Sequence, residues 1–151
     1  MISFVCKNFQ ALTTEELYKI LALRTEVFVV EQNCPYQDVD GKDLHSIHVL
    51  GYIKNQLVAY ARVLGQGISY KEYASIGRIV TSPAVRGNNH GHDLVDFSIK
   101  VCQKNFPGQP IKISAQAHLE KFYNKYGFKA TGEAYLEDDI PHIGMILKDK
   151  E

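Results

Sequence analysis

The spacing of apolar residues changes repeatedly along this chain, and the order of the changes limits the folds that it can adopt. Apolar residues at intervals of three and four predict amphipathic helices at about 13–29, 91–105 and 119–126. Shorter apolar runs bounded by turn residues predict strands at 2–6, 47–53, 57–65, 74–81, 111–114, 128–136 and 142–148. The order β-α-β-β-β-α-β-α-β-β is typical of a mixed sheet with helices on its faces.

Local signals support several of these boundaries. Thr13-x-x-Glu16 has the spacing of a capping box, which predicts a helix start. Gly127 suits the position after the end of the third helix. Gly77 lies inside a predicted strand, where a glycine indicates a bulge or a close backbone approach. Residues 31–46 are rich in Asn, Asp, Pro and Gly and are expected to form a loop.

Charge and composition exclude several classes of protein. The 151 residues suit a single domain over 1–151, and 17 basic residues balance 17 acidic ones. That balance argues against a nucleic-acid partner bound through bulk positive charge. No apolar run is long enough for a membrane span and no secretory signal is visible, so we expect no membrane partner. Three widely separated cysteines fit a reduced, cytoplasmic protein.

Residues 79–94 read I-V-T-S-P-A-V-R-G-N-N-H-G-H-D-L, so a strand, a short loop and a helix follow one another. The first N–H groups of a helix have no internal partner and carry partial positive charge, which suits an anion. Asn88 and Asn89 tolerate the tight turns that otherwise need glycine, and Arg86 adds a permanent charge. The loop matches neither a P-loop nor G-x-G-x-x-G. It predicts an anion site, and an ordinary helix start is the alternative.

Two motifs in the chain occur in an order known from one superfamily. Arg86-Gly87-Asn88-Asn89-His90-Gly91 is followed later by Phe122-Tyr123-Asn124-Lys125-Tyr126-Gly127-Phe128. The first resembles the pyrophosphate loop Arg/Gln-x-x-Gly-x-Gly/Ala of the GNAT superfamily of N-acetyltransferases, with Asn89 in place of its first glycine. The second resembles that superfamily's Tyr-x-x-x-Gly-Phe motif. Further segments resemble the ElaA family of bacterial GNAT proteins, namely 23–24, 27–38, 40–41, 57–62, 115–119 and 140–145.

The resemblance implies the GNAT acyl-CoA N-acyltransferase fold and acetyl-CoA as co-substrate, with no metal. That fold is an α+β arrangement with a central, mixed, mostly antiparallel sheet of about seven strands, flanked by helices and splayed between the fourth and fifth strands. The pantetheine arm would lie in that gap, and a backbone N–H of residues 79–81 would polarise the thioester carbonyl. The cofactor-binding residues expected are Ile79, Val80, Thr81, Arg86, Gly87, Asn88, Asn89, His90, Gly91, His92, Gln116 and Tyr123.

Catalysis by this route needs an acid and a base. Tyr123 matches the superfamily's general acid, and an ordinary tyrosine pKa of about 10 keeps the hydroxyl protonated at neutral pH. The alternative is a packing role beside Leu119 and Phe122. An alkylamine with a pKa of about 10.4 must lose a proton before it attacks. The sequence leaves the base open among Glu31, Asp38, Asp40, His118 and His142; Glu31 is expected as a base or acceptor contact and His142 as an acceptor contact.

The function expected is transfer of an acetyl group to a primary amine of a small molecule or peptide, by direct attack in a ternary complex. Two alternatives remain open: a non-catalytic acyl-CoA sensor and an acyltransferase for longer acyl-CoA. A Cys34 nucleophile and a metal site are weaker interpretations, because no Cys-His pairing is evident, and a calcium loop starting at Asp38 fails at Asp43 and Val49. The fold class also allows a homodimer.

Overall fold

A computed structural model describes residues 1–148 and contains a mixed sheet with the strand order β1-β2-β3-β4-β5-β7-β6. Only β4 and β5 are parallel neighbours, and the other pairs are antiparallel. The predicted fold and order of elements are confirmed. The strands are β1 (Ser3–Asn8), β2 (Ile47–Ile53), β3 (Gln56–Leu64), β4 (Ala74–Thr81), β5 (Ile111–Gln116), β6 (Lys129–Glu137) and β7 (Ile140–Leu147).

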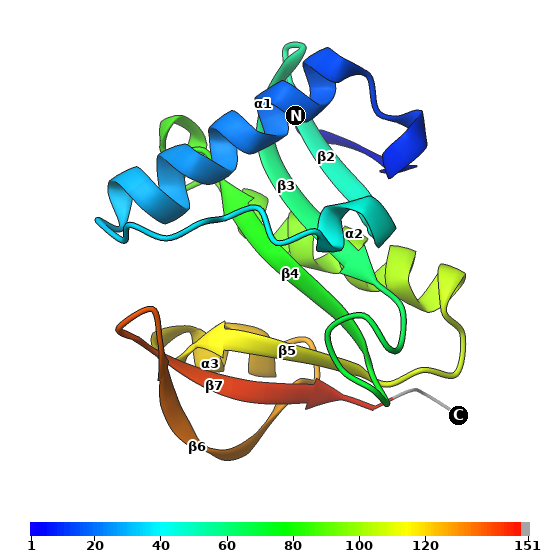
Figure 1. Ribbon diagram of the computed structural model, residues 1–151, viewed down its shortest axis with the longest axis vertical. Coiled ribbons are helices and arrows are strands. Elements are labelled where there is room, and N and C mark those ends of the chain that lie inside the picture. Colours follow the sequence, from blue (N-terminus) through cyan, green and yellow to red (C-terminus); the bar gives the residue numbers. More distant parts are fainter. Residues whose placement is uncertain (149–151) are drawn as a thin grey trace.

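Helices α1 (Thr14–Arg24) and α2 (His90–Asn105) cover opposite faces of the sheet (Figure 1). The alternation of side chains along the central strands explains this arrangement. Leu50 and Tyr60 pack with Ile20 of α1, whereas their neighbours Val49 and Ala61 belong to the core that includes α2. The short helix α3 (Glu120–Asn124) joins the second core.

Helix α1 begins as expected but ends differently. The capping box of Thr13 and Glu16 is present. A regular helix to residue 29 is wrong, because the α-helix ends at Arg24 and a π-helical segment, Thr25–Glu31, follows. This segment is rich in β-branched residues, which have low helix propensity. The Thr25 hydroxyl also donates to the Leu21 carbonyl oxygen at 2.8 Å.

The third helix is shorter than its apolar spacing suggests. The expected 119–126 region forms a 3-10 turn, Ala117–Leu119, followed by α3. Gly127 has a φ of +94°, and the Phe128 N–H donates to the Tyr123 carbonyl oxygen at 3.3 Å. The predicted glycine position after this helix is confirmed.

Strands β4 and β5 are paired at one end only. Their register includes Ala74 with Ile111 and Ser75 with Lys112, and beyond these pairs the strands separate (Figure 1). The register of β3 with β4 gains one residue on β4 between Gly77 and Val80. The predicted bulge and splay are therefore confirmed. The left-handed residue of the bulge is Arg78, at a φ of +47°.

Two features are absent from the part of the chain that the structure describes. None of the helices within residues 1–148 has the length and apolar character needed to cross a membrane. In the same residues, no group of three or more His, Cys, Asp or Glu side chains is placed to hold a metal ion.

Candidate active site

The gap between β4 and β5 opens into a cleft of about 590 Å³. One wall is β4 from Ile76 to Thr81, and the other is β5 from Ile113 to Gln116. Side chains of the π-helical segment, α3 and the β6–β7 turn close the remaining sides. Ile79, Val80, Thr81 and Gln116 all line this cleft, as does Tyr123. The cleft thus collects residues that are far apart in the sequence.

The loop before α2 presents an open backbone at one end of the cleft. Gly87 has a φ of +90° and Asn89 a φ of +62°, so asparagine takes the left-handed conformation at position 89; Asn88 does not, and its side-chain amide donates to the Val85 carbonyl oxygen. A Cβ built at Gly91 meets no atom within 4 Å. An anion can therefore approach the free N–H groups of the first turn of α2 without a side chain in the way.

Arg86 of this loop, and His90 and His92 at the start of α2, differ in the contacts that their side chains make. Arg86 forms a bidentate ion pair with Glu31, at 2.6 and 2.7 Å. His92 lies against Phe122 and hydrogen-bonds the Tyr126 hydroxyl at 2.9 Å, so it joins α2 to α3. His90 Nδ1 is buried without a hydrogen-bond partner among the described residues, which leaves a polar atom free at the start of α2.

Tyr123 of α3 lines the cleft. Its side chain is 6% exposed and packs edge-on against Phe122 and Phe128, yet it lines the cavity. Burial raises the pKa of Tyr123 to about 12. Its hydroxyl therefore stays protonated at neutral pH, which is the state that a general acid requires.

The cleft is also lined by Glu31, Cys34, Glu137 and His142. The Arg86 guanidinium lowers the pKa of Glu31, which weakens this carboxylate as a base. Burial, with Asp138 and Asp139, raises the pKa of the Cys34 thiol, which disfavours a thiolate nucleophile. His142 is 8% exposed, and its Nδ1 donates to the Ile140 carbonyl oxygen at 2.7 Å.

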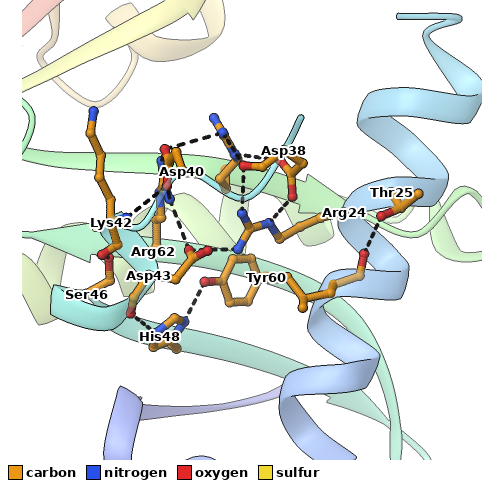
Figure 2. A network of polar contacts seen from close by, with 12 residues as sticks. Arg24, Thr25, Asp38, Asp40, Lys42, Asp43, Ser46, His48, Tyr60 and Arg62 are labelled. Atoms are coloured by element: carbon orange, nitrogen blue, oxygen red, sulfur yellow. Dashed lines mark hydrogen bonds and ion pairs between the residues drawn. The ribbon is translucent and has the colours of Figure 1, made fainter. Parts of the chain in front are cut away.

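A buried polar network fixes the loop that holds Asp38, Asp40 and Asp43, and Asp38 contacts Tyr36 and Arg78 of the cleft lining. Figure 2 shows Arg24 of α1 and Arg62 of β3 bonded to one Asp43 carboxylate, at 2.8 and 3.0 Å. Arg24 also bonds Asp38, and Arg62 bonds both oxygens of Asp40. Three aspartates from one loop are thereby tied to a helix and a strand.

This network gives Asp38 and Asp40 a structural role. Arg62 holds the pKa of Asp40 well below its usual range, and Asp38 is buried in ion pairs with Arg24 and Arg78. Both carboxylates are occupied by arginines, so neither is free to take a proton from an acceptor. His118, the remaining base candidate, lines the cleft from the turn that precedes α3.

Two charged residues that line the cleft, Arg78 and Glu137, were not predicted from the sequence. Arg78 reaches Asp38 at 2.7 Å from the bulge of β4, and no local pattern reveals that contact. Glu137 lies between the strands predicted at 128–136 and 142–148, and its carboxylate lies 3.4 Å from His142. The short spacing of Glu137 and His142 across a predicted hairpin is the signal that could have paired them.

Comparison with known proteins defines the class. Residues 10–148 match the Acetyltransferase (GNAT) domain. The chain is 45% identical over 147 residues to protein ElaA of Escherichia coli, covering 96% of this chain and 95% of ElaA. The chain belongs to the GNAT acetyltransferase family, and its relatives within that family include ElaA.

Solved structures agree with this assignment. An acyl-CoA N-acyltransferase from Pseudomonas aeruginosa has a TM-score of 0.92 and 46% identity, covering 97% of this chain and 99% of that one. The crystal structure of E. coli ElaA also has a TM-score of 0.92, with 43% identity and coverage of 98% and 100%. An aminoglycoside 6'-N-acetyltransferase complexed with coenzyme A shares the fold, with a TM-score of 0.69, 16% identity, and coverage of 95% and 96%. Fold and family together are those of acyl-CoA-dependent acyltransferases.

Proposed function

We propose that this protein transfers an acetyl group from acetyl-CoA to a primary amine, by direct attack in a ternary complex. The observation that carries the proposal is the cleft itself. The gap between β4 and β5 brings Tyr123, an unpaired strand edge and Gly91 at the start of α2 to the lining of one cavity. Each of these groups has a defined use in thioester chemistry.

The residues around the cleft fit a CoA thioester. The open backbone at Gly87 and Gly91 suits a pyrophosphate, with the unpartnered His90 Nδ1 at the same end. The edge of β4 from Ile79 to Thr81 suits an amide chain that pairs as an added strand. Acetyl-CoA, when bound, would supply the activated acetyl group on its sulfur.

The chain's own groups would then act on each side of the reaction. A backbone N–H of residues 79–81 would donate to the carbonyl oxygen as negative charge develops there. The Tyr123 hydroxyl, held protonated by its raised pKa, would give its proton to the leaving sulfur. Glu137 and Asp138, two acidic residues that line the cleft, would attract a protonated amine.

A thiol-release assay tests this proposal. We expect the protein to release thiol from acetyl-CoA with at least one primary amine, and to form the matching amide. Tyr123→Phe should lower kcat by about 10²-fold or more, because it removes the acid, while its Kd for CoA stays within about twofold. Tyr126→Phe is the matched control, because this hydroxyl binds His92 outside the cleft, and it should keep kcat within about threefold.

Each alternative predicts a different result. Tight CoA binding without thiol release for any amine would identify a sensor. Faster release from longer acyl-CoA than from acetyl-CoA would identify a different donor. Unchanged kcat in Tyr123→Phe would remove the acid role.

A further inference from the structure

His142 offers a base in the part of the cleft lined by Glu137, Asp138 and His142, which we call the acceptor end. It lies on β7 opposite Gln116 of β5, and its side chain is almost fully buried. Its Nδ1 is 2.7 Å from the carbonyl oxygen of Ile140. A carbonyl oxygen can only accept a hydrogen bond, so Nδ1 carries the hydrogen and Nε2 of the neutral ring carries the lone pair.

Glu137 lies beside that lone pair. Its Oε2 is 3.4 Å from Nε2 of His142, whereas a charge-assisted hydrogen bond between such atoms usually spans about 2.7–2.9 Å. Nε2 and the carboxylate are therefore neighbours without a tight bond. An ammonium group placed beside them finds two acceptors at once.

We propose that Glu137 and His142 form the acceptor site, in which Glu137 holds the protonated amine and Nε2 of His142 takes its proton. The proposal rests on the proposed function, because it names the site's substrate class and its base. The fixed Nδ1–H leaves Nε2 as the proton acceptor, and the Glu137 carboxylate stabilises the imidazolium that forms.

The surrounding charges favour a cation. Tyr135 of β6 stacks on the His142 ring, and the Ser114 hydroxyl of β5 lies 3.5 Å from Glu137. The other titratable groups that line the cleft are Glu31, Cys34, Tyr36, Arg78, Arg86, His118, Tyr123 and Asp138.

Of these groups, the two arginines are already neutralised: Arg78 pairs with Asp38, and Arg86 pairs with Glu31. Within residues 1–148, no arginine or lysine lies within ion-pair distance of Glu137 or Asp138. The acceptor end is therefore acidic, and it suits an alkylammonium whose far end is not a carboxylate.

Every proton in the proposed step has a donor and an acceptor. The proton leaves the acceptor nitrogen for Nε2 of His142, and the freed lone pair forms the N–C bond with the acyl carbon. The C–S bond breaks, and the sulfur takes the proton of the Tyr123 hydroxyl. As the amide forms, its nitrogen gives up a second proton to solvent. Solvent also removes the proton from His142 and restores the one on Tyr123.

Binding of 1,4-diaminobutane to the protein–CoA complex tests the site without turnover. Glu137→Gln should weaken binding by about tenfold or more in calorimetry, and His142→Gln by less than about threefold. Asp139→Asn, in the same turn but outside the cleft lining, is the matched control and should bind as the unmodified protein does. Equal affinity in Glu137→Gln, or 4-aminobutyrate binding as tightly as the diamine, would overturn the inference.

Kinetics test the base. With the diamine, His142→Gln should lower kcat by about 10²-fold or more, leave KM nearly unchanged, and remove the acid limb of the pH profile. Hydroxylamine is largely unprotonated at neutral pH, so its rate should fall by less than about tenfold in the same variant. Equal losses for both acceptors, or an acid limb removed by His118→Gln in place of His142→Gln, would contradict the role.

The two proposals fail in different ways. If the unmodified protein releases thiol and His142→Gln keeps full turnover, the acetyltransferase function stands and the base is wrong. If the unmodified protein binds CoA but releases no thiol with any amine, the function itself is wrong, and the acceptor site is overturned with it.

Discussion

Asp40 is a loop carboxylate whose two oxygens are both occupied by arginine side chains. Both of its oxygens bond Arg62, at 2.7 and 2.8 Å, and it also lies 3.5 Å from Arg78. No periodicity shows this role, because Arg62 comes from a strand 22 positions later. From the sequence, Asp40 was as good a candidate for the catalytic base as Glu31 or Asp38. Only the folded structure shows that the Asp40 carboxylate forms ion pairs and is not free to act as a base.

The ion pair of Asp40 predicts a pH-dependent contribution to stability. Arg62 keeps the folded-state pKa of Asp40 below the unfolded value of about 3.9. The contribution is therefore present above that unfolded value, and it is lost as the pH falls through the lower folded-state value. Because the carboxylate is partly exposed, we expect Asp40→Asn to cost about 1 kcal/mol at pH 7.

Urea unfolding at several pH values checks this expectation. The difference in unfolding free energy between the unmodified protein and Asp40→Asn should shrink as the pH falls below about 4. Asp96→Asn, in the exposed pair with Lys100, should cost less than about 0.5 kcal/mol at pH 7. A difference for Asp40→Asn that grows as the pH falls would show that the predicted direction is wrong.

At the scale of elements, local signals were reliable where the interactions are local. The capping box fixed the start of α1, and Gly127 marked the end of the α3 region. The end of α1 was not predictable from the same spacing, because apolar residues three and four positions apart do not distinguish an α from a π turn. In the π-helical segment Val27 is buried and Phe28 is partly buried. The π-helical segment carries Phe28 and Glu31 into the cleft lining, so the misread element belongs to the candidate site.

The loop that begins α2 carries the next prediction. Gly91 has an ordinary helical backbone and open space around its Cβ position, so a side chain there should not disturb folding. Gly91→Glu would place a carboxylate beside the bound pyrophosphate. We expect it to weaken CoA binding by about 100-fold or more in calorimetry.

A smaller substitution separates charge from size. Gly91→Ala adds a methyl group without charge and should lose at most about tenfold in affinity for CoA. Both variants should unfold at nearly the temperature of the unmodified protein. Normal CoA affinity in Gly91→Glu would show that the pyrophosphate lies elsewhere.

On the scale of the whole molecule, the chain follows its family's plan of a sheet that opens on one side. No pattern of residues shows how far two strands stay paired. The splay was expected only because two motifs, Arg86–Gly91 and Tyr123–Phe128, resemble those of the GNAT superfamily. The structure shows that the bulge of β4, with Arg78 in a left-handed conformation, follows shortly after the last residues of β4 that pair with β5. The contact of Glu137 with His142 spans the β6–β7 hairpin, and its short spacing in the sequence was the signal for it. The contact of Arg78 with Asp38 joins distant segments and became visible only in the fold.

A crystal structure with coenzyme A bound would decide whether the open sheet is a cofactor site. We expect the pyrophosphate on the backbone of residues 87–92, the pantetheine arm along Ile79–Thr81, and the sulfur within hydrogen-bond reach of the Tyr123 hydroxyl. Coenzyme A bound outside the cleft, or strands β4 and β5 closed against each other along their whole length, would contradict this expectation.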